Sequence, residues 1–213
     1  MGAPIEERGG FAIPFDGPFA AMDAELARAQ RRERVRGALA DPDPEVRAAA
    51  SRALERLDRR RDLDLLLGRL SSADVRDRVE AVYGLGAVAD PEAVPPLVAA
   101  LRDPVEDVRA AAVRMLAEIR DERGLSPIAQ CLDDPSALVR RHAIDALGRF
   151  ADRRVVPLLL TMLKERDLET LAPAVRALGL CRDREAEPAI AALLLHSSPI
   201  VRAAAVEALA QLD

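Results

Sequence analysis

Two cysteines and two histidines are the residues of this chain that are best suited to nucleophilic, acid–base or metal chemistry. Cys131 and Cys181 lack the spacing of a disulfide framework or a metal cluster, and both fit the pattern of small buried hydrophobic residues. His142 and His196 do not combine with a serine and an aspartate into a convincing triad, and no glycine-rich phosphate loop is present. We therefore predict no catalytic, cofactor-binding or metal-ligating residue, and a protein that is not an enzyme.

The composition limits the classes of protein to which the chain belongs. Its 213 residues are 50% hydrophobic and 31% charged, which is typical of a folded, water-soluble chain. Aromatic residues make up 2%, so the core has to be built from Ala, Leu, Val and Ile, which favours closely packed helices. A net charge of -5 speaks against a nucleic-acid partner. Without a long apolar run or a secretory signal, we expect a cytoplasmic protein that does not insert into membranes.

From about residue 28 onward the sequence repeats with a period of 31 residues and without gaps. Such self-similarity is the signature of a solenoid of stacked units. Four apolar columns carry the repeat: Leu39, Leu70, Leu101, Leu132, Leu163 and Leu194; Ala50, Ala81, Ala112, Ala143, Ala174 and Ala205; Leu54, Leu85, Leu116, Leu147, Leu178 and Leu209; and Val35, Leu66, Leu97, Ile128, Leu159 and Ile190.

Each unit divides into two helical segments, as residues 90–120 illustrate. Asp90 is a good N-cap and Pro91 a good first residue for one helix, whose apolar residues recur at steps of three and four. Asp103 is placed to cap a second helix. The alanine column lets helices approach closely, and the leucine columns fill the layer between neighbouring units. Because neither helix buries its apolar stripe alone, stacking must stabilise the fold.

The period also sets the domain organisation that we predict. Residues 1–20 form a tail rich in Pro, Gly and Phe, and a solenoid follows over residues 21–213. The first helix is expected to start near Ala20 or Ala21. The repeats comprise residues 28–58, 59–89, 90–120, 121–151, 152–182 and 183–213.

The segments DPDPEVRAAASRAL, DPVEDVRAAAVRML and SSPIVRAAAVEAL resemble HEAT repeats, in particular the short bacterial subtype first associated with phycobilisome lyases. The resemblance covers residues 28–213. It implies an all-α, right-handed solenoid of about six antiparallel helix pairs. The first helices would line the convex side of this solenoid, and the second helices the concave side.

Enzymes with HEAT-like folds provide the alternatives to a non-catalytic protein. Deoxyhypusine hydroxylase needs His-Glu pairs for its iron, and neither His142 nor His196 is followed by Glu. HEAT-like DNA glycosylases use a basic groove with aromatic residues beside a catalytic Asp, whereas this chain is acidic, with one Tyr and no Trp. A bilin lyase or lyase-like accessory protein, which delivers a tetrapyrrole to a protein cysteine, remains an alternative. The resemblance to the repeats of phycobilisome lyases suggests it.

A recurrent arginine follows the second cap in every repeat except the fifth: Arg47, Arg78, Arg109, Arg140 and Arg202. In HEAT repeats this arginine usually pairs with acidic or backbone groups of a neighbouring repeat, and an anion-binding ladder is the alternative. In the fifth repeat Leu171 replaces it and Pro173 follows, so we expect the second helix to start late or to kink, with altered curvature. We also expect a neighbouring group to lose its ion pair at Leu171.

The second helices each have a face that does not contain the buried alanine column. We expect this stripe of residues to be exposed and to line the concave groove. It is rich in Arg near its middle and contains Tyr83, the single Tyr of the chain. Tyr and Arg are enriched in the hot spots of protein interfaces. An ordinary solvated helix face is the alternative. The candidate partner-binding residues are Arg52, Arg56, Tyr83, Arg114, Arg141, His142, Arg149 and Arg176.

The two ends of the chain supply further candidate contacts. Phe11, Phe15 and Phe19 gather in the tail, among Gly and Pro residues that disfavour a helix. They either cap the apolar edge of the first repeat or form a linear motif for a partner, and an inert leader is the third alternative. In the last repeat, the face with Leu193 and Leu195 lacks a polar capping helix. We expect it to meet a partner or to self-associate, or else this repeat is the weakest of the chain.

These patterns together predict a non-enzymatic scaffold or adaptor that binds another protein through the concave stripe, the tail or both. An accessory protein of the lyase type, which handles a bilin-bearing partner, is the first alternative. A structural subunit of a larger assembly is the second. We expect no cofactor in any of these roles.

Overall fold

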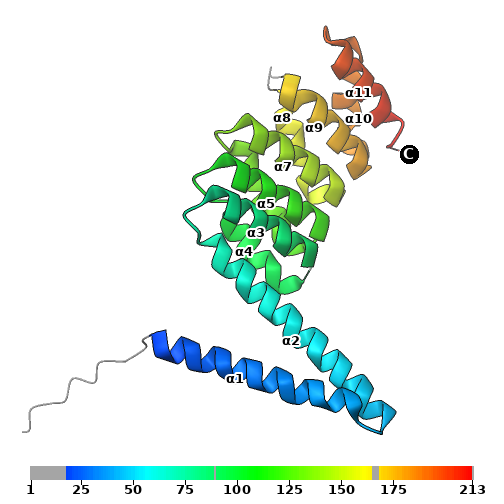
Figure 1. Cartoon of the computed structure of the whole chain (residues 1–213). Coiled ribbons are helices and arrows are strands. Elements are labelled where there is room, and N and C mark those ends of the chain that lie inside the picture. The colour runs from blue at the N-terminus through cyan, green and yellow to red at the C-terminus, as the bar shows by residue number, and fades with distance from the viewer. Residues whose placement is uncertain (1–17, 89, 165–167, 213) are drawn as a thin grey trace, which may run out of the picture. The chain divides into compact units, whose positions relative to one another are not determined.

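The computed structural model describes residues 18–88, 90–164 and 168–212. In these ranges the chain forms eleven α-helices and seven short 3-10 helices, and it contains no β-strand (Figure 1). No described helix has both the length and the hydropathy that a crossing of the bilayer requires.

The α-helices are α1 (Pro18–Gly37), α2 (Pro44–Leu70), α3 (Val75–Val88), α4 (Val94–Ala100), α5 (Glu106–Ile119), α6 (Leu125–Gln130), α7 (Ala137–Phe150), α8 (Val156–Met162), α9 (Leu168–Cys181), α10 (Glu187–Ala192) and α11 (Pro199–Leu209). The 3-10 helices are η1 (Ala38–Ala40), η2 (Pro91–Ala93), η3 (Glu122–Gly124), η4 (Cys131–Asp133), η5 (Arg153–Val155), η6 (Arg184–Ala186) and η7 (Leu193–Leu195).

The contacts within the chain divide it into two units, Met1–Arg60 and Arg61–Asp213. The first unit holds α1, η1 and the N-terminal part of α2. Helix α1 begins at Pro18, slightly before the predicted start, because proline suits the first turn of a helix. Arg32 on α1 forms an ion pair with Asp58 on α2, with 2.6 Å between Nε and Oδ1. Among the described residues of this unit only Ala50 is buried.

Helix α2 runs without interruption across residue 59, where the period predicts the start of the second repeat. The later repeats begin with an aspartate that caps the next helix, but Arg59 occupies this column. An arginine offers no acceptor for the exposed N–H groups of a new helix, so nothing favours a break. The predicted boundary between residues 58 and 59 therefore lies inside one long helix.

In the second unit, successive helix pairs stack in chain order (Figure 1). The second helices α3, α5, α7, α9 and α11 each pack against the next one, and each shorter first helix packs against the second helix of its own pair. Capping carboxylates start these pairs by accepting a backbone N–H two residues later at 2.8 to 3.0 Å, and they belong to Asp90, Asp121, Asp152 and Asp183. The predicted all-α solenoid is confirmed.

The predicted apolar columns form the core of the second unit. The alanine column is completely buried at Ala81, Ala112, Ala143, Ala174 and Ala205. The columns of larger residues are at most 1% exposed at Leu85, Leu97, Leu116, Ile128, Leu147, Leu159, Leu178 and Ile190. Burial decreases in the last helix pair, where Leu194 is 36% exposed.

Small residues set the spacing of neighbouring second helices. A Cβ atom on Gly148 would lie 3.0 Å from the Cα of Ala177, and one on Gly179 would lie 2.7 Å from the Cα of Ala208. A larger residue at Gly179 would therefore force α9 and α11 apart.

The fifth repeat keeps a second helix of ordinary length in spite of its proline. Helix α9 begins at Leu168, in the same column as the first residues of the other second helices, and Pro173 lies inside it. The predicted late start of this helix is therefore wrong. Leu171, Ala172 and Pro173 are all buried, so tertiary packing outweighs the local preference of proline against a helix.

Candidate functional site

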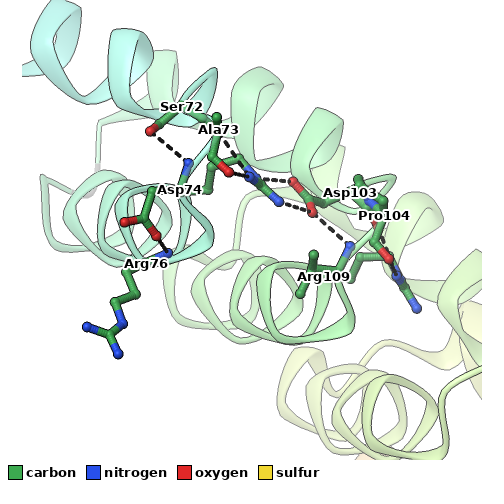
Figure 2. A network of polar contacts seen from close by, with 9 residues as sticks. Ser72, Ala73, Asp74, Arg76, Asp103, Pro104 and Arg109 are labelled. Atoms are coloured by element: carbon green, nitrogen blue, oxygen red, sulfur yellow. Dashed lines mark hydrogen bonds and ion pairs between the residues drawn. The ribbon is translucent and has the colours of Figure 1, made fainter.

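The recurrent arginines hold the loop that precedes each second helix. Nη1 of Arg109 donates to the carbonyl oxygens of Asp103 and Pro104 at 2.9 and 3.2 Å (Figure 2). These bonds fix the entry of the chain into α5. The same pair of bonds, to carbonyls six and five residues earlier, is made by Arg47, Arg78, Arg140 and Arg202.

Two of these arginines also bind an aspartate of the following repeat. Arg78 donates from Nε and Nη2 to the carboxylate of Asp103 at 2.8 and 3.1 Å. Arg109 binds Asp134 in the same way, with both bonds at 2.8 Å. The side chains of the second pair are only 12% and 8% exposed. Bidentate, charge-assisted bonds of this kind are strong and directional, so each pair ties one repeat to the next.

The electrostatics of these pairs follow from their burial and their partners. Burial is the largest single influence on the Asp103 and Asp134 carboxyls and raises the pKa of each. The hydrogen bonds from Arg78 and Arg109, those from backbone N–H groups and the nearby positive charges together outweigh burial, so each pKa lies below its ordinary value. The same bonds raise the pKa of both arginines. These guanidinium groups are occupied within the protein, which favours their structural interpretation over an anion-binding ladder.

At the joint between the fifth and sixth repeats, both members of the pair are different. Leu171 occupies the arginine column, and His196 occupies the aspartate column. Nδ1 of His196 accepts the N–H of Ser198 at 3.1 Å, which is the bond that Asp134 accepts from Ser136. The loss of the arginine at Leu171 thus leaves no carboxylate without its partner in this column, contrary to our expectation.

The exposed side of the second helices is hollowed across α3, α5 and α7. The groove has a volume of about 500 Å³. Buried or half-buried apolar residues form one part of its wall, namely Val75, Val79, Ala110, Ala111 and Leu138. Polar and charged residues form the other part, namely Arg76, Glu80, Tyr83, Asp107, Arg114 and His142.

Tyr83 and Arg114 form the centre of the candidate site. Nη1 of Arg114 donates to the Tyr83 hydroxyl at 3.1 Å, and the guanidinium carbon lies 5.7 Å from the centre of the ring. This is cation–π geometry, which holds the arginine in place without neutralising it. Arg114 has no ion pair within the described part of the chain, so its charge is available to a partner.

His142 lines the groove on α7, and its pKa reflects burial and the charges around it. Its pKa is lowered, mainly by burial and then by the positive charges of Arg141 and Arg114. Arg149 acts in the same direction, and Asp145 opposes it. The imidazole is therefore neutral at neutral pH, and the surrounding arginines make this end of the groove favourable for an anionic group.

The structure brings together three residues of the predicted stripe, Tyr83, Arg114 and His142. The other arginines of the stripe are exposed and do not line the groove: Arg141 and Arg149 on α7, Arg176 on α9, and Arg52 and Arg56 on α2 in the first unit. Phe11, Phe15 and the side chain of Phe19 lie outside the described residues, so their role stays a prediction.

Sequence analysis missed Arg76, Asp107 and Leu138, which also line the groove. They share one column of the repeat. Arg76 and Asp107 each precede a predicted residue, Tyr83 and Arg114 respectively, by two helical turns. Residues two turns apart lie on the same helix face, so a step of seven residues would have found them.

The two cysteines lie apart from this groove, whereas His142 lines it. Within the described ranges no group of three or more His, Cys, Asp or Glu residues is placed to hold a metal ion. Cys131 and Cys181 are buried free thiols, and burial raises the pKa of each to about 11. Thiolate is therefore scarce at neutral pH. Cys131 lines a second, smaller hollow of about 290 Å³ beside α4 and α6.

Comparison with known proteins agrees with this architecture. A model of HEAT repeats matches residues 63–137, 100–172 and 162–213. The complex of CpcE and CpcF of phycocyanin lyase from Nostoc sp. PCC7120 is similar at 27% identity with a TM-score of 0.63, over 70% of this chain. The match covers 64% of that chain, which is less than two thirds of its length. A designed armadillo repeat protein in complex with the peptide (KR)4 is similar in fold at 24% identity and a TM-score of 0.56, over 85% of this chain and 99% of its own. No curated protein matches the sequence.

Proposed function

Because the chain belongs to the HEAT-repeat family, we propose that it is a non-enzymatic scaffold or adaptor whose groove across α3, α5 and α7 holds a segment of a partner protein. Solenoids of this family present an extended face of stacked helices, which suits the binding of an extended segment. We place this activity in the cytoplasm, in agreement with two free thiols in a reducing compartment.

The observation that carries this proposal is the arrangement of Tyr83 and Arg114 beside an apolar wall. A directed positive charge, an aromatic ring and buried apolar side chains within one groove are the features of an interface hot spot. Since the ring already orients the arginine, binding loses little side-chain entropy there. We expect the partner segment to place a carboxylate on Arg114 and a neighbouring apolar side chain on the wall.

The proposal is tested by affinity capture from a lysate of the source organism, followed by binding measurements with each captured protein in purified form. Tyr83→Ala and Arg114→Glu are compared with Arg176→Glu, which makes the same charge change outside the groove. We expect both groove variants to weaken binding of one partner by about tenfold or more, while the control retains it. A deletion of residues 1–17 distinguishes the groove from the tail, because loss of the partner only in that variant assigns binding to the tail.

The alternative function is that of a lyase-type accessory protein that handles a bilin-bearing partner. The likeness to CpcE and CpcF of a phycocyanin lyase favours it. The raised pKa of Cys131 and Cys181 disfavours attack by either thiol, so any such role would be non-covalent. Absorbance spectra of a free bilin, recorded with increasing protein, test this alternative. A saturable spectral change would support it, and an unchanged spectrum would contradict it.

A further inference from the structure

We propose that copies of this chain associate end to end, with the last repeat of one copy joined to the first repeat of another in the way in which repeats are joined inside the chain. This inference is independent of the groove. It rests on unpaired features of the first and sixth repeats that match each other.

The joint between the third and fourth repeats shows what a complete contact contains. Arg109 anchors Nη1 on its own loop and directs Nε and Nη2 to Asp134, 25 residues later. Beside this pair the apolar side chain of Val113 is fully buried. On the receiving side, Val139 is fully buried as well. This joint therefore combines a donor arginine and a valine on one face with an aspartate and a valine on the other.

The sixth repeat carries the donor face of such a joint. Nη1 of Arg202 bonds to the carbonyls of His196 and Ser197 at 2.7 and 2.9 Å, in the same way as Arg109. Its Nε and Nη2 have no carboxylate partner within the described residues. Val206, in the column of Val113, is 59% exposed, and Ala203 and Ala210 beside it are exposed too.

The first repeat carries the acceptor face. Asp41 lies in the column of Asp134 and accepts the N–H of Asp43 at 2.9 Å, the capping bond of that column. Its carboxylate has no arginine partner within the described residues. Val46, in the column of Val139, is 40% exposed, and most residues of the first unit whose burial is described are exposed as well.

The two faces also match in register and in size. Asp41 occupies the acceptor column of the 31-residue period, so a second copy that pairs with Arg202 continues the period without a shift. The small residue Ala210 would meet Ala53, which lies in the column of Ala177 and Ala208. Inside the chain, this combination of small residues permits close approach of second helices.

Charge decides the orientation of the two copies. Joining two sixth repeats face to face would place Arg202 against Arg202, and joining two first repeats would place Asp41 against Asp41. Only the head-to-tail contact brings opposite charges together. Such a heterologous contact produces either open chains or a closed ring, in contrast to the closed dimer of a two-fold interface.

Sedimentation velocity of the full chain over a concentration series tests this proposal. We expect the average mass to rise above the monomer mass of 23.0 kDa with concentration. Asp41→Asn keeps the acceptor for the Asp43 N–H but removes the charge, and Val206→Glu leaves the Arg202 loop untouched; each should weaken association about tenfold or more. Leu65→Glu, at a residue that is 57% exposed, serves as the matched control and should have no effect.

A mixing experiment distinguishes this contact from other modes of association. Val46→Glu and Val206→Glu variants should each be monomeric alone, and their equimolar mixture should form dimers, because each retains one intact face and the two altered faces carry the same charge. Arg114→Glu should associate like the wild type, so a failure of the groove proposal and a failure of this one give different results. A wild-type chain that stays monomeric at its highest soluble concentration overturns the proposal, as does association that Asp41→Asn and Val206→Glu both leave unchanged.

Discussion

Replacing Arg109 by leucine is the sharpest test of how the repeats are held together. The fifth repeat has Leu171 in the same column, so the side chain fits this kind of joint. In that repeat, however, the partner column holds His196, whereas Asp134 would remain beside the new leucine. The variant therefore leaves a largely buried carboxylate without its bidentate arginine, and only the more distant charge of Arg140 remains near it.

The size of the effect follows from the bonds that are lost. Arg109 donates two hydrogen bonds to Asp134 and two to backbone carbonyls. Removing one partner of a buried ion pair lowers the free energy of unfolding by about 3–5 kcal/mol. Since solvent still reaches the pair and leucine adds apolar contact, we expect about 3 kcal/mol. The double variant Arg109→Leu/Asp134→His copies the native pair of the fifth joint and should lose only about 1–2 kcal/mol.

Urea unfolding followed by circular dichroism at several pH values measures these differences. In the wild type the pKa of Asp134 is lowered from 3.8, so its contribution is complete above that value and is lost as the pH falls through the folded pKa. In Arg109→Leu the hydrogen bonds and the charge of the arginine are lost, so this pKa rises relative to that of the wild type, while the Ser136 N–H and Arg140 still lower it. Protonation of Asp134 removes the unpaired charge in the variant. The difference in the free energy of unfolding between the variant and the wild type should therefore become smaller as the pH falls below about 4.

Two outcomes would refute this reasoning. One is a change in the free energy of unfolding below about 0.5 kcal/mol for Arg109→Leu, which is the size of an ordinary surface substitution. The other is a double variant that is as unstable as the single one or more so, because the unpaired Asp134 carboxylate would then not be the source of the loss. Arg149→Leu, at an exposed arginine of α7, is the control for loss of charge alone.

Further predictions concern the core, the helix spacing and the thiols. Leu116→Ala should lower the free energy of unfolding by about 2–5 kcal/mol in urea titrations, since Leu116 is 1% exposed. Gly179→Val should destabilise the last repeat, measured as faster amide hydrogen exchange in α11, whereas Gly68→Val, with open space around it, should leave α11 unchanged. Cys131 and Cys181 should react with iodoacetamide much more slowly in the native state than in urea at pH 8, and equal rates would contradict their burial.

The core of the second unit was predictable because burial there repeats with the helix geometry. Ala112 and Leu116 lie four residues apart on one face, and the same spacing recurs in every repeat. The continuous helix α2 was also readable in principle, since Arg59 stands in the capping column. The 31-residue period by itself predicts a break before residue 59, because the apolar columns continue on both sides of the missing cap.

Two features depended on tertiary packing and could not be predicted from local patterns. Pro173 lies inside α9 because buried neighbours stabilise the turn, which local preference alone disfavours. Tyr83 and Arg114 share a column in adjacent repeats, and both were predicted to lie in the exposed stripe, but the groove beside them depends on the size of other side chains. Ala110 and Ala111 on α5 occupy the columns that hold the larger residues Val79 and Glu80 on α3. No sequence motif indicates that these smaller side chains leave room for a groove.

The joints between repeats use two kinds of contact, and the chain distributes them unevenly. Where Leu171 replaces the arginine, the joint relies on close packing, since a Cβ on Gly179 would lie 2.7 Å from the Cα of Ala208. The sixth repeat thus lacks the bidentate arginine–aspartate pair towards the fifth, although Nε of Arg153 lies 3.9 Å from Oδ2 of Asp183 across the same joint. Its own Arg202 has no carboxylate partner within the described residues. Asp41 of a second copy would supply a charged joint on the other side of this repeat. Because a ligand that binds only the folded state stabilises it, end-to-end association would stabilise the sixth repeat.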